Sequence, residues 1–112
     1  RICVVEIEKQ RFLQAACVFP VSAGMVVRTN SERVIQSRRR TLELMLANHP
    51  QDCLVCDVGG DCELQDLAVS MNLHHVRYES QDPQLAMDAS HPRFIMDPNR
   101  CVSCTRCIRH HL

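Results

Sequence analysis

The sequence lacks several features that mark common classes of protein. It has no Trp, one Tyr and three Phe in 112 residues, so a purely hydrophobic core would be thin. No apolar run approaches the roughly 20 residues of a membrane-spanning helix, and no secretory signal pattern opens the chain. The formal net charge is zero, which argues against a nucleic-acid-binding protein. We therefore expect metal ligation to supply part of the stability.

Cysteine, in contrast, is abundant, with eight residues in the chain. Six of them lie in clusters with intervening segments of two or five residues, too close for comfortable disulfide pairing inside each cluster. Reduced, metal-bound cysteines account for this pattern better than the disulfide framework of a small secreted scaffold. The scaffold remains the weaker alternative.

The first cluster is the most informative motif, HPQDCLVCDVGGDCELQ in residues 49–65. It sets His49, Cys53, Cys56 and Cys62 at the spacing H-x3-C-x2-C-x5-C around a Gly-containing loop. Three thiolates and an imidazole could hold zinc or a [4Fe-4S] cluster. The spacing favours the cluster, because a zinc finger usually has two such knuckles separated by a longer loop. Taken alone, His49 would be an ordinary residue at a helix C-terminus.

A second run, Cys101, Cys104 and Cys107, has the C-x2-C-x2-C spacing typical of iron–sulfur ligation. A [4Fe-4S] cluster needs a fourth ligand, which we expect beyond the end of the chain, with His111 as the less favoured alternative. Two cluster motifs in a short chain indicate an electron carrier.

Hydrophobic patterns predict an α+β fold. β-Branched runs predict strands of a mostly antiparallel sheet, in residues 3–7, 14–18 and 24–28. A capping box with Thr29 as N-cap predicts a helix that extends to about residue 48, where His49-Pro50 ends it. We also expect a helix over residues 62–72, a short strand at 94–96 and a last helix from about residue 104.

Three consecutive arginines, Arg38, Arg39 and Arg40, lie on the predicted long helix. A solvated helix face is the simpler interpretation of this run. A docking surface is the alternative, because arginine is favoured at polar interfaces.

The motifs HPQDCLVCDVGGDCELQDL and RCVSCTRCIR, with LQAAC and GMVVRT, resemble the N-terminal iron–sulfur region of the large subunit of respiratory complex I, NADH:quinone oxidoreductase. Diaphorase subunits of NAD-linked [NiFe] hydrogenases, iron-only hydrogenases and NAD-linked formate dehydrogenases share this module. The resemblance implies three parts: the end of a β-grasp [2Fe-2S] ferredoxin domain (1–30), a helical, loop-rich His/Cys [4Fe-4S] domain (31–75), and a connector that begins a ferredoxin-type [4Fe-4S] segment (76–112).

The resemblance also implies which residues bind clusters. One [4Fe-4S] cluster would be held by His49, Cys53, Cys56 and Cys62. A second [4Fe-4S] cluster would have three of its iron atoms bound by Cys101, Cys104 and Cys107. Cys3 and Cys17, an uninformative pair on their own, would be the third and fourth ligands of a [2Fe-2S] cluster. The family's other two ligands precede the position of Arg1, so that site is incomplete in this chain.

The function implied is conduction of single electrons from NADH, through a flavin on a partner subunit, to a downstream acceptor that is quinone in complex I. The same relay in an NAD-linked hydrogenase or formate dehydrogenase is the alternative, and a zinc-binding interaction module is the second. The resemblance further implies an internal segment of an oxidoreductase subunit with no catalytic residue in this chain. It would lie on the cytoplasmic or matrix side of a membrane, touching it only through partners.

Overall fold

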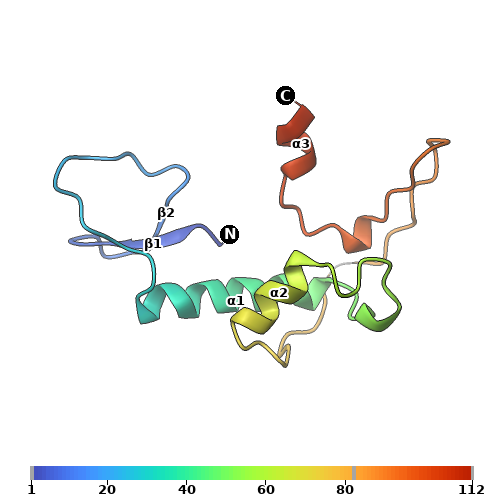
Figure 1. Cartoon of the computed structure of the whole chain (residues 1–112), viewed down its shortest axis with the longest axis horizontal. Helices are drawn as coiled ribbons and strands as arrows, with labels where there is room; N and C mark the ends of the chain where they lie inside the picture. The colour runs from blue at the N-terminus through green and yellow to red at the C-terminus, as the bar shows by residue number, and fades with distance from the viewer. Residues whose placement is uncertain (1, 82, 112) are drawn as a thin grey trace.

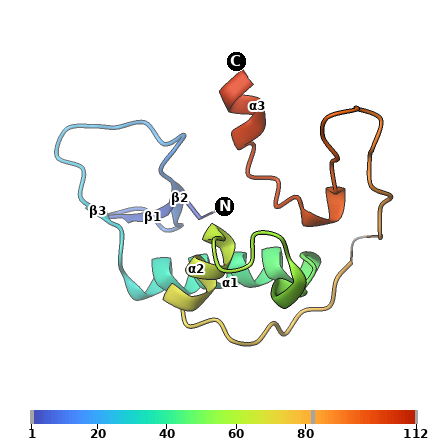
Figure 2. The same cartoon turned by 45° about the vertical axis from the view of Figure 1, so that its right-hand side comes forward.

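A computed structural model describes residues 2–81 and 83–111 (Figures 1 and 2). A small sheet lies near the start of the long helix α1 (Glu32–Asn48), and α2 (Glu63–Ser70) lies over α1 in both views. The C-terminal segment with α3 (Arg106–His111) stands apart from the sheet. The radius of gyration is 17.0 Å, whereas a compact domain of this length has about 13 Å. The chain is therefore elongated.

The sheet has three antiparallel strands in the order β2-β1-β3. They are β1 (Val4–Ile7), β2 (Gln14–Ala15) and β3 (Val27–Arg28). The paired residues are Val4 with Ala15, Val5 with Gln14, Glu6 with Arg28, and Ile7 with Val27. All three predicted strands exist, although each is shorter than expected.

Helix α1 begins and ends for local reasons. Ser31 is its N-cap, and the Ser31 hydroxyl accepts a hydrogen bond from the Val34 N–H at 3.4 Å. The prediction of Thr29 as N-cap was wrong, because Ser31 directly precedes the first helical residue and its short side chain reaches the first turn. The predicted end is confirmed: His49 is extended (φ −93°, ψ 137°), as the residue before a proline prefers.

The hydrophobic core is small and is built on one face of α1. Val34 and Leu42 have no exposed surface, and they share a face because they lie eight positions apart in a helix. Val5 and Ile7 of β1 are buried with them at one end of the molecule, and Leu73 is buried after α2. Each such side chain contributes about 1.5–3 kcal/mol on burial. Five residues of this kind make a thin core, as the composition predicts.

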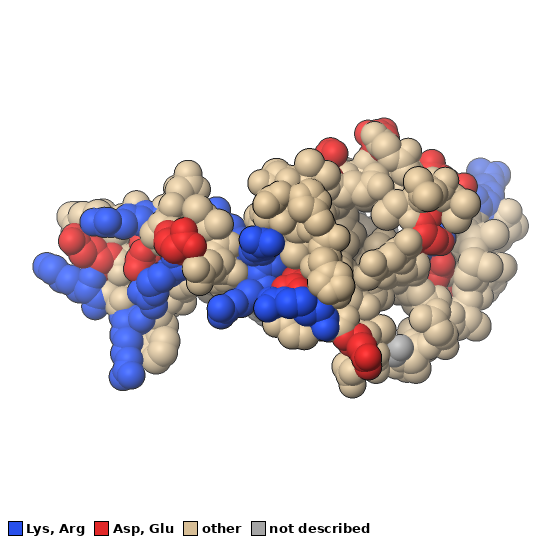
Figure 3. All heavy atoms as spheres, turned by 90° about the horizontal axis from the view of Figure 1, so that it is seen from below, with Lys and Arg blue, Asp and Glu red and all other residues tan. Residues whose placement is uncertain are grey.

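Two residues of the arginine run connect α1 to other parts of the chain. Arg38 donates from Nε to the Ile2 carbonyl at 3.1 Å and from Nη2 to the Val4 carbonyl at 2.9 Å. Arg39 donates from Nη2 to the carbonyl of Asn72, at 3.0 Å. The simpler interpretation, a purely solvated face, was therefore wrong for Arg38, whereas Arg39 and Arg40 are exposed. In Figure 3, basic side chains extend from the left end of the molecule to the middle of the face seen from below, with acidic side chains among them.

An ion pair fixes the segment after α2 to α1. Glu43 is 2% exposed, and its carboxylate accepts hydrogen bonds from Arg77 Nε at 2.8 Å, Nη2 at 2.7 Å and the backbone N–H at 2.9 Å. The hydrogen bonds from the Arg77 side chain are the main cause that lowers the pKa of Glu43 to about 2. These contacts hold Arg77, in the segment after α2, against the helix.

The remaining elements differ in detail from the sequence prediction. Helix α2 begins one residue after Cys62, and α3 begins at Arg106 instead of near residue 104. The predicted strand at 94–96 was wrong: within the described ranges, this segment forms only one bridge, between Asp88 and Met96. No helix in the described residues is both long and apolar enough to cross a membrane.

The Glu43–Arg77 pair predicts a pH-dependent stability. Because the pKa of Glu43 is lower in the folded chain than its ordinary value of 4.5, the pair stabilises fully above that value and is lost as pH falls toward about 2. We expect Glu43→Gln to lower the melting temperature by several degrees at pH 7. The difference in melting temperature between this variant and wild type should disappear as the pH falls from 4.5 toward about 2. Thermal unfolding followed by circular dichroism at a series of pH values measures both effects.

Glu32→Gln is the matched control, since Glu32 is an exposed carboxylate on the same helix. It should change the melting temperature little at any pH. A gap for Glu43→Gln that does not depend on pH would show that the carboxylate charge is not its source.

Candidate metal centre

His49 presents a free nitrogen at the end of α1. Its backbone N–H donates to the Leu46 carbonyl at 3.3 Å, so His49 does act as a C-cap. Its side-chain Nδ1, however, is buried and has no hydrogen-bond partner in the described structure. Buried polar atoms without a partner are rare and costly. A ligand position for Nδ1 would account for this exception.

The electrostatic surroundings keep the His49 ring neutral. Burial is the main cause that lowers its pKa, and the nearby Arg100 charge acts in the same direction, partly opposed by Asp52 and Asp97. Neutral imidazole is the form that binds metals. The site is therefore suited to ligation by His49.

The loop after His49 curls tightly around its cysteines. Cys53 begins the short 3-10 turn η1 (Cys53–Val55), and Cys56 follows it. The Gly59 N–H donates to the Cys56 carbonyl at 2.9 Å. A Cβ added at Gly59 would lie 2.5 Å from the Cys53 carbonyl oxygen and 3.0 Å from that of Cys56. Only glycine allows the backbone to approach so closely.

Cys62 completes this group at the start of α2. It is the N-cap, but its thiol does not cap the helix by a hydrogen bond, so the sulfur remains available as a ligand. The loop is joined to α2 by the Gly60 N–H, which donates to Gln65 Oε1 at 3.0 Å. His49 and Cys53 line one cavity together with Gln65.

The donor set fits a polynuclear group. Among the described residues, no three His, Cys, Asp or Glu side chains converge closely enough to hold one metal ion. The ligands of a [4Fe-4S] cluster do not need to converge on one metal ion, because the four ligands bind four different iron atoms. Three cysteines and an imidazole, which lie in sequence between the end of α1 and the start of α2, are the ligand types that such a cluster takes.

The second cysteine run lies on a separate, more open segment. Cys101 follows the 3-10 turn η2 (Pro98–Arg100), Cys107 lies in α3, and all three cysteines of the run are exposed. Ser103 and Thr105 have positive φ angles of 53° and 63°, which are uncommon for residues other than glycine and often mark functional segments. The His111 side chain, the alternative fourth ligand, lies outside the described residues.

Cys3 and Cys17 come together through the pairing of β1 and β2. Their sulfur atoms are 3.4 Å apart, close to the roughly 3.8 Å between two thiolates that share one tetrahedral metal with 2.3 Å bonds. The hydrogen bond from the Cys17 thiol is the main cause that lowers the pKa of Cys3, which favours its thiolate. All eight cysteines are free.

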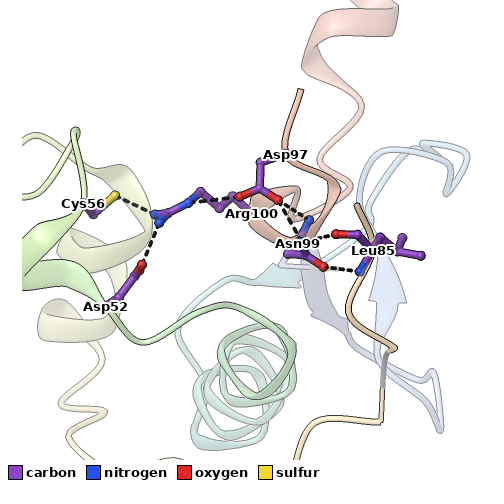
Figure 4. A network of polar contacts seen from close by, with 6 residues as sticks. All are labelled: Asp52, Cys56, Leu85, Asp97, Asn99 and Arg100. Atoms are coloured by element: carbon purple, nitrogen blue, oxygen red, sulfur yellow. Dashed lines mark hydrogen bonds and ion pairs between the residues drawn. The ribbon is translucent and has the colours of Figure 1, made fainter. Parts of the chain in front are cut away.

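The sequence interpretation missed Arg100. Its Nη1 donates to Cys56 Sγ at 3.1 Å, its Nη2 to Asp52 Oδ2 at 2.6 Å, and its Nε lies 3.3 Å from Asp97 Oδ2 (Figure 4). The only local signal was its position directly before Cys101. These contacts connect the two cysteine motifs, which are separated in sequence by more than one element.

A second set of hydrogen bonds holds the turn that carries Arg100. Asp97 caps this turn through Oδ1, which accepts from the Asn99 N–H at 3.0 Å. The Asn99 side chain donates to the Leu85 carbonyl at 2.8 Å and accepts from the Leu85 N–H at 2.9 Å (Figure 4). The turn that precedes Arg100 is thus held by Asp97 within the turn and by Leu85 from a distant segment.

Two family models place the chain among proteins that bind iron–sulfur clusters. Residues 38–77 match the family model described as the NADH-ubiquinone oxidoreductase-G iron-sulfur binding region, and residues 1–32 match a 2Fe-2S iron-sulfur cluster binding domain. The chain therefore contains a segment that matches the iron–sulfur region of the G-type subunits of NADH-quinone oxidoreductase, and it resembles the subunits that carry this region.

Individual relatives come from two kinds of enzyme complex. A G-type subunit of NADH-quinone oxidoreductase from Rhizobium meliloti is 43% identical over 97% of this chain and 13% of its own length. The HndD subunit of the NADP-reducing hydrogenase from Solidesulfovibrio fructosivorans is 43% identical over 96% of this chain and 18% of its own. The chain thus spans less than a fifth of either relative.

The fold itself is also found in a solved structure. A chain in the crystal structure of an NAD+-reducing [NiFe]-hydrogenase matches with a TM-score of 0.85 and 38% identity, over 96% of this chain and 45% of that chain. The elongated arrangement of sheet, helices and C-terminal segment is therefore one that a chain of this hydrogenase adopts.

The close packing at Gly59 gives a prediction about cluster loading. We expect Gly59→Ala to displace the Cys53 and Cys56 backbone at a cost of about 1–3 kcal/mol, and to lower the iron and sulfide content of the purified protein. Gly24→Ala is the control: its φ of +75° also disfavours alanine, but no atom lies within 4 Å of the added Cβ. It should lose stability and keep its iron. Equal iron content in both variants would contradict the prediction.

Proposed function

We propose that the chain is an electron-relay segment of an NADH-linked oxidoreductase complex. The observation that carries this proposal is the buried, unpartnered Nδ1 of His49 beside a tightly curled cysteine loop, within the residues that match the iron–sulfur region of the G-type subunits. Subunits of NADH-quinone oxidoreductase and of hydrogenases are the relatives that support it. Both work in assemblies that exchange electrons with a nicotinamide.

Each cysteine set is assigned to one cluster. His49, Cys53, Cys56 and Cys62 hold one [4Fe-4S] cluster. Cys101, Cys104 and Cys107 hold a second, whose fourth ligand comes from outside the chain, and Cys3 with Cys17 supplies half of the ligands of a [2Fe-2S] cluster. Residues 1–30, 31–75 and 76–112 are the corresponding units: the end of a β-grasp ferredoxin domain, the His/Cys domain and the start of a ferredoxin-type segment.

The residues of the chain bind and shield these centres and perform no bond chemistry. Bound clusters would accept and release one electron at a time. Neutral His49, whose Nδ1 is buried at the end of α1, and the thiolates ligate iron. A flavin subunit that oxidises NADH is the expected partner, and a peripheral position on a larger complex follows from this role.

The same residues could serve a hydrogenase. The relative of 43% identity in a NADP-reducing hydrogenase and the 38% identical chain in an NAD+-reducing hydrogenase favour this second candidate. In that context the electrons would run between a hydrogen-activating centre and the nicotinamide site. The relay chemistry of this chain would be unchanged.

Metal analysis separates the relay from a zinc-binding module. Protein produced anaerobically with iron supplied should be brown and contain iron together with acid-labile sulfide. The measurement is elemental analysis with a visible spectrum. Stoichiometric zinc in colourless protein would reject the relay.

Substitution of the imidazole tests the ligand assignment. In the full-length protein that contains this chain, His49→Ala should remove or alter the EPR signal of one [4Fe-4S] cluster, because one iron loses its protein ligand. The signal of the Cys101 centre should persist. His74→Ala is a control, since His74 is exposed and hydrogen-bonded to Asn72. Unchanged signals in His49→Ala would exclude His49 as a ligand.

A further inference from the structure

The Arg100 side chain joins the two cysteine motifs through a sulfur. Arg100, directly before Cys101, places one guanidinium nitrogen on the sulfur of Cys56 and another on the carboxylate of Asp52. The Arg100 side chain is 37% exposed, so its charge is only partly screened by water. The planar guanidinium can make both contacts at once because its N–H groups form a rigid fork.

The position of this fork is determined by the surrounding turn. Asp97 approaches Arg100 Nε and caps the turn, and Asn99 pairs with the backbone of Leu85. The two carboxylates, Asp52 and Asp97, hold the guanidinium by charge on either side of its contact with sulfur (Figure 4). A guanidinium held in this way has little freedom to leave the thiolate for solvent.

An N–H donor and a positive charge at a ligating sulfur act on the redox balance of a cluster. Uptake of one electron adds one negative charge and forms or breaks no bond to the protein. The donor and the charge stabilise the more negative, reduced form, and therefore raise the reduction potential. Both effects reach the centre through Cys56.

We propose that Arg100 is a positioning residue that raises the reduction potential of the His49, Cys53, Cys56 and Cys62 centre. It also fixes this centre relative to the Cys101 run, because the same residue begins that run. The inference rests on the proposed cluster ligation and adds to it a residue that ligates nothing. The reduction potential of the His49 centre would then depend on the fold of the segment that carries Cys101, Cys104 and Cys107.

Arg106 offers a matched comparison. It belongs to the same cysteine run and pairs with Glu63, the neighbour of Cys62, at 2.5 Å. Its hydrogen-bonded partner is this carboxylate and not a sulfur, and its side chain is 71% exposed. Removing Arg106 therefore removes an equal charge and a second link between the motifs, but no N–H donor to a thiolate.

The test is an EPR-monitored redox titration of the full-length protein that contains this chain, following the signal that His49→Ala alters. We expect Arg100→Gln to lower the midpoint potential by ~59 mV. At the wild-type midpoint, the ratio of reduced to oxidised cluster would then fall about tenfold, because the cluster takes up one electron. The midpoint potential of Arg100→Lys should lie between those of wild type and Arg100→Gln, because lysine keeps the positive charge but lacks the two-pronged guanidinium. Arg106→Gln should shift the midpoint less than Arg100→Gln.

The outcomes separate this inference from the proposed function. Wild-type protein without iron and sulfide would refute the cluster assignment itself. A loaded cluster with the same midpoint in wild type and Arg100→Gln, or equal shifts for Arg100→Gln and Arg106→Gln, would overturn the role of Arg100 alone. If Arg100→Gln fails to load, Arg100→Lys decides: a midpoint below wild type supports the role, and the wild-type midpoint overturns it.

Discussion

The attachment of other segments to α1 is the constraint on which the rest of the structure depends. The chain buries few apolar side chains, and Val34 and Leu42 on this helix are the most completely buried of them. The sheet is held to α1 through Arg38, and the segment after α2 is held through Glu43. Because the core is thin, these polar contacts help to set the position of the helix relative to the segments at its two ends. One of those ends carries His49.

The elements whose signals are local could be predicted from the sequence. The end of α1 follows from Pro50, and the antiparallel strands follow from β-branched runs. The N-cap was assigned to Thr29 instead of Ser31, because two hydroxyl residues stand close together and the sequence pattern does not show which one meets the first turn. The isolated bridge at Met96 was mistaken for a strand, since an apolar triplet does not reveal whether a partner strand exists.

The candidate site divides in the same way. Ligand candidates are recognisable from spacing, because short loops between cysteines cost little entropy to close around one centre. Arg100 and the close approach at Gly59 depend on how distant or tightly turned backbone segments meet, and no periodicity encodes that. Arg100 lies between a turn signal and a cysteine run, so attention to either motif alone passes over it. Contacts between motifs require the tertiary structure.

Under the proposed function, His49 and Arg100 act on the same centre in the same electrostatic direction. Under the proposed ligation, a neutral imidazole replaces one thiolate and makes the centre less negative, and the guanidinium at Cys56 reduces its negative charge further. Asp52 and Asp97 oppose this effect, but they also hold the guanidinium in place. The two carboxylates therefore moderate the local field while making it rigid. A fixed field needs little reorganisation when an electron arrives, and this suits a centre whose only task is to pass the electron on.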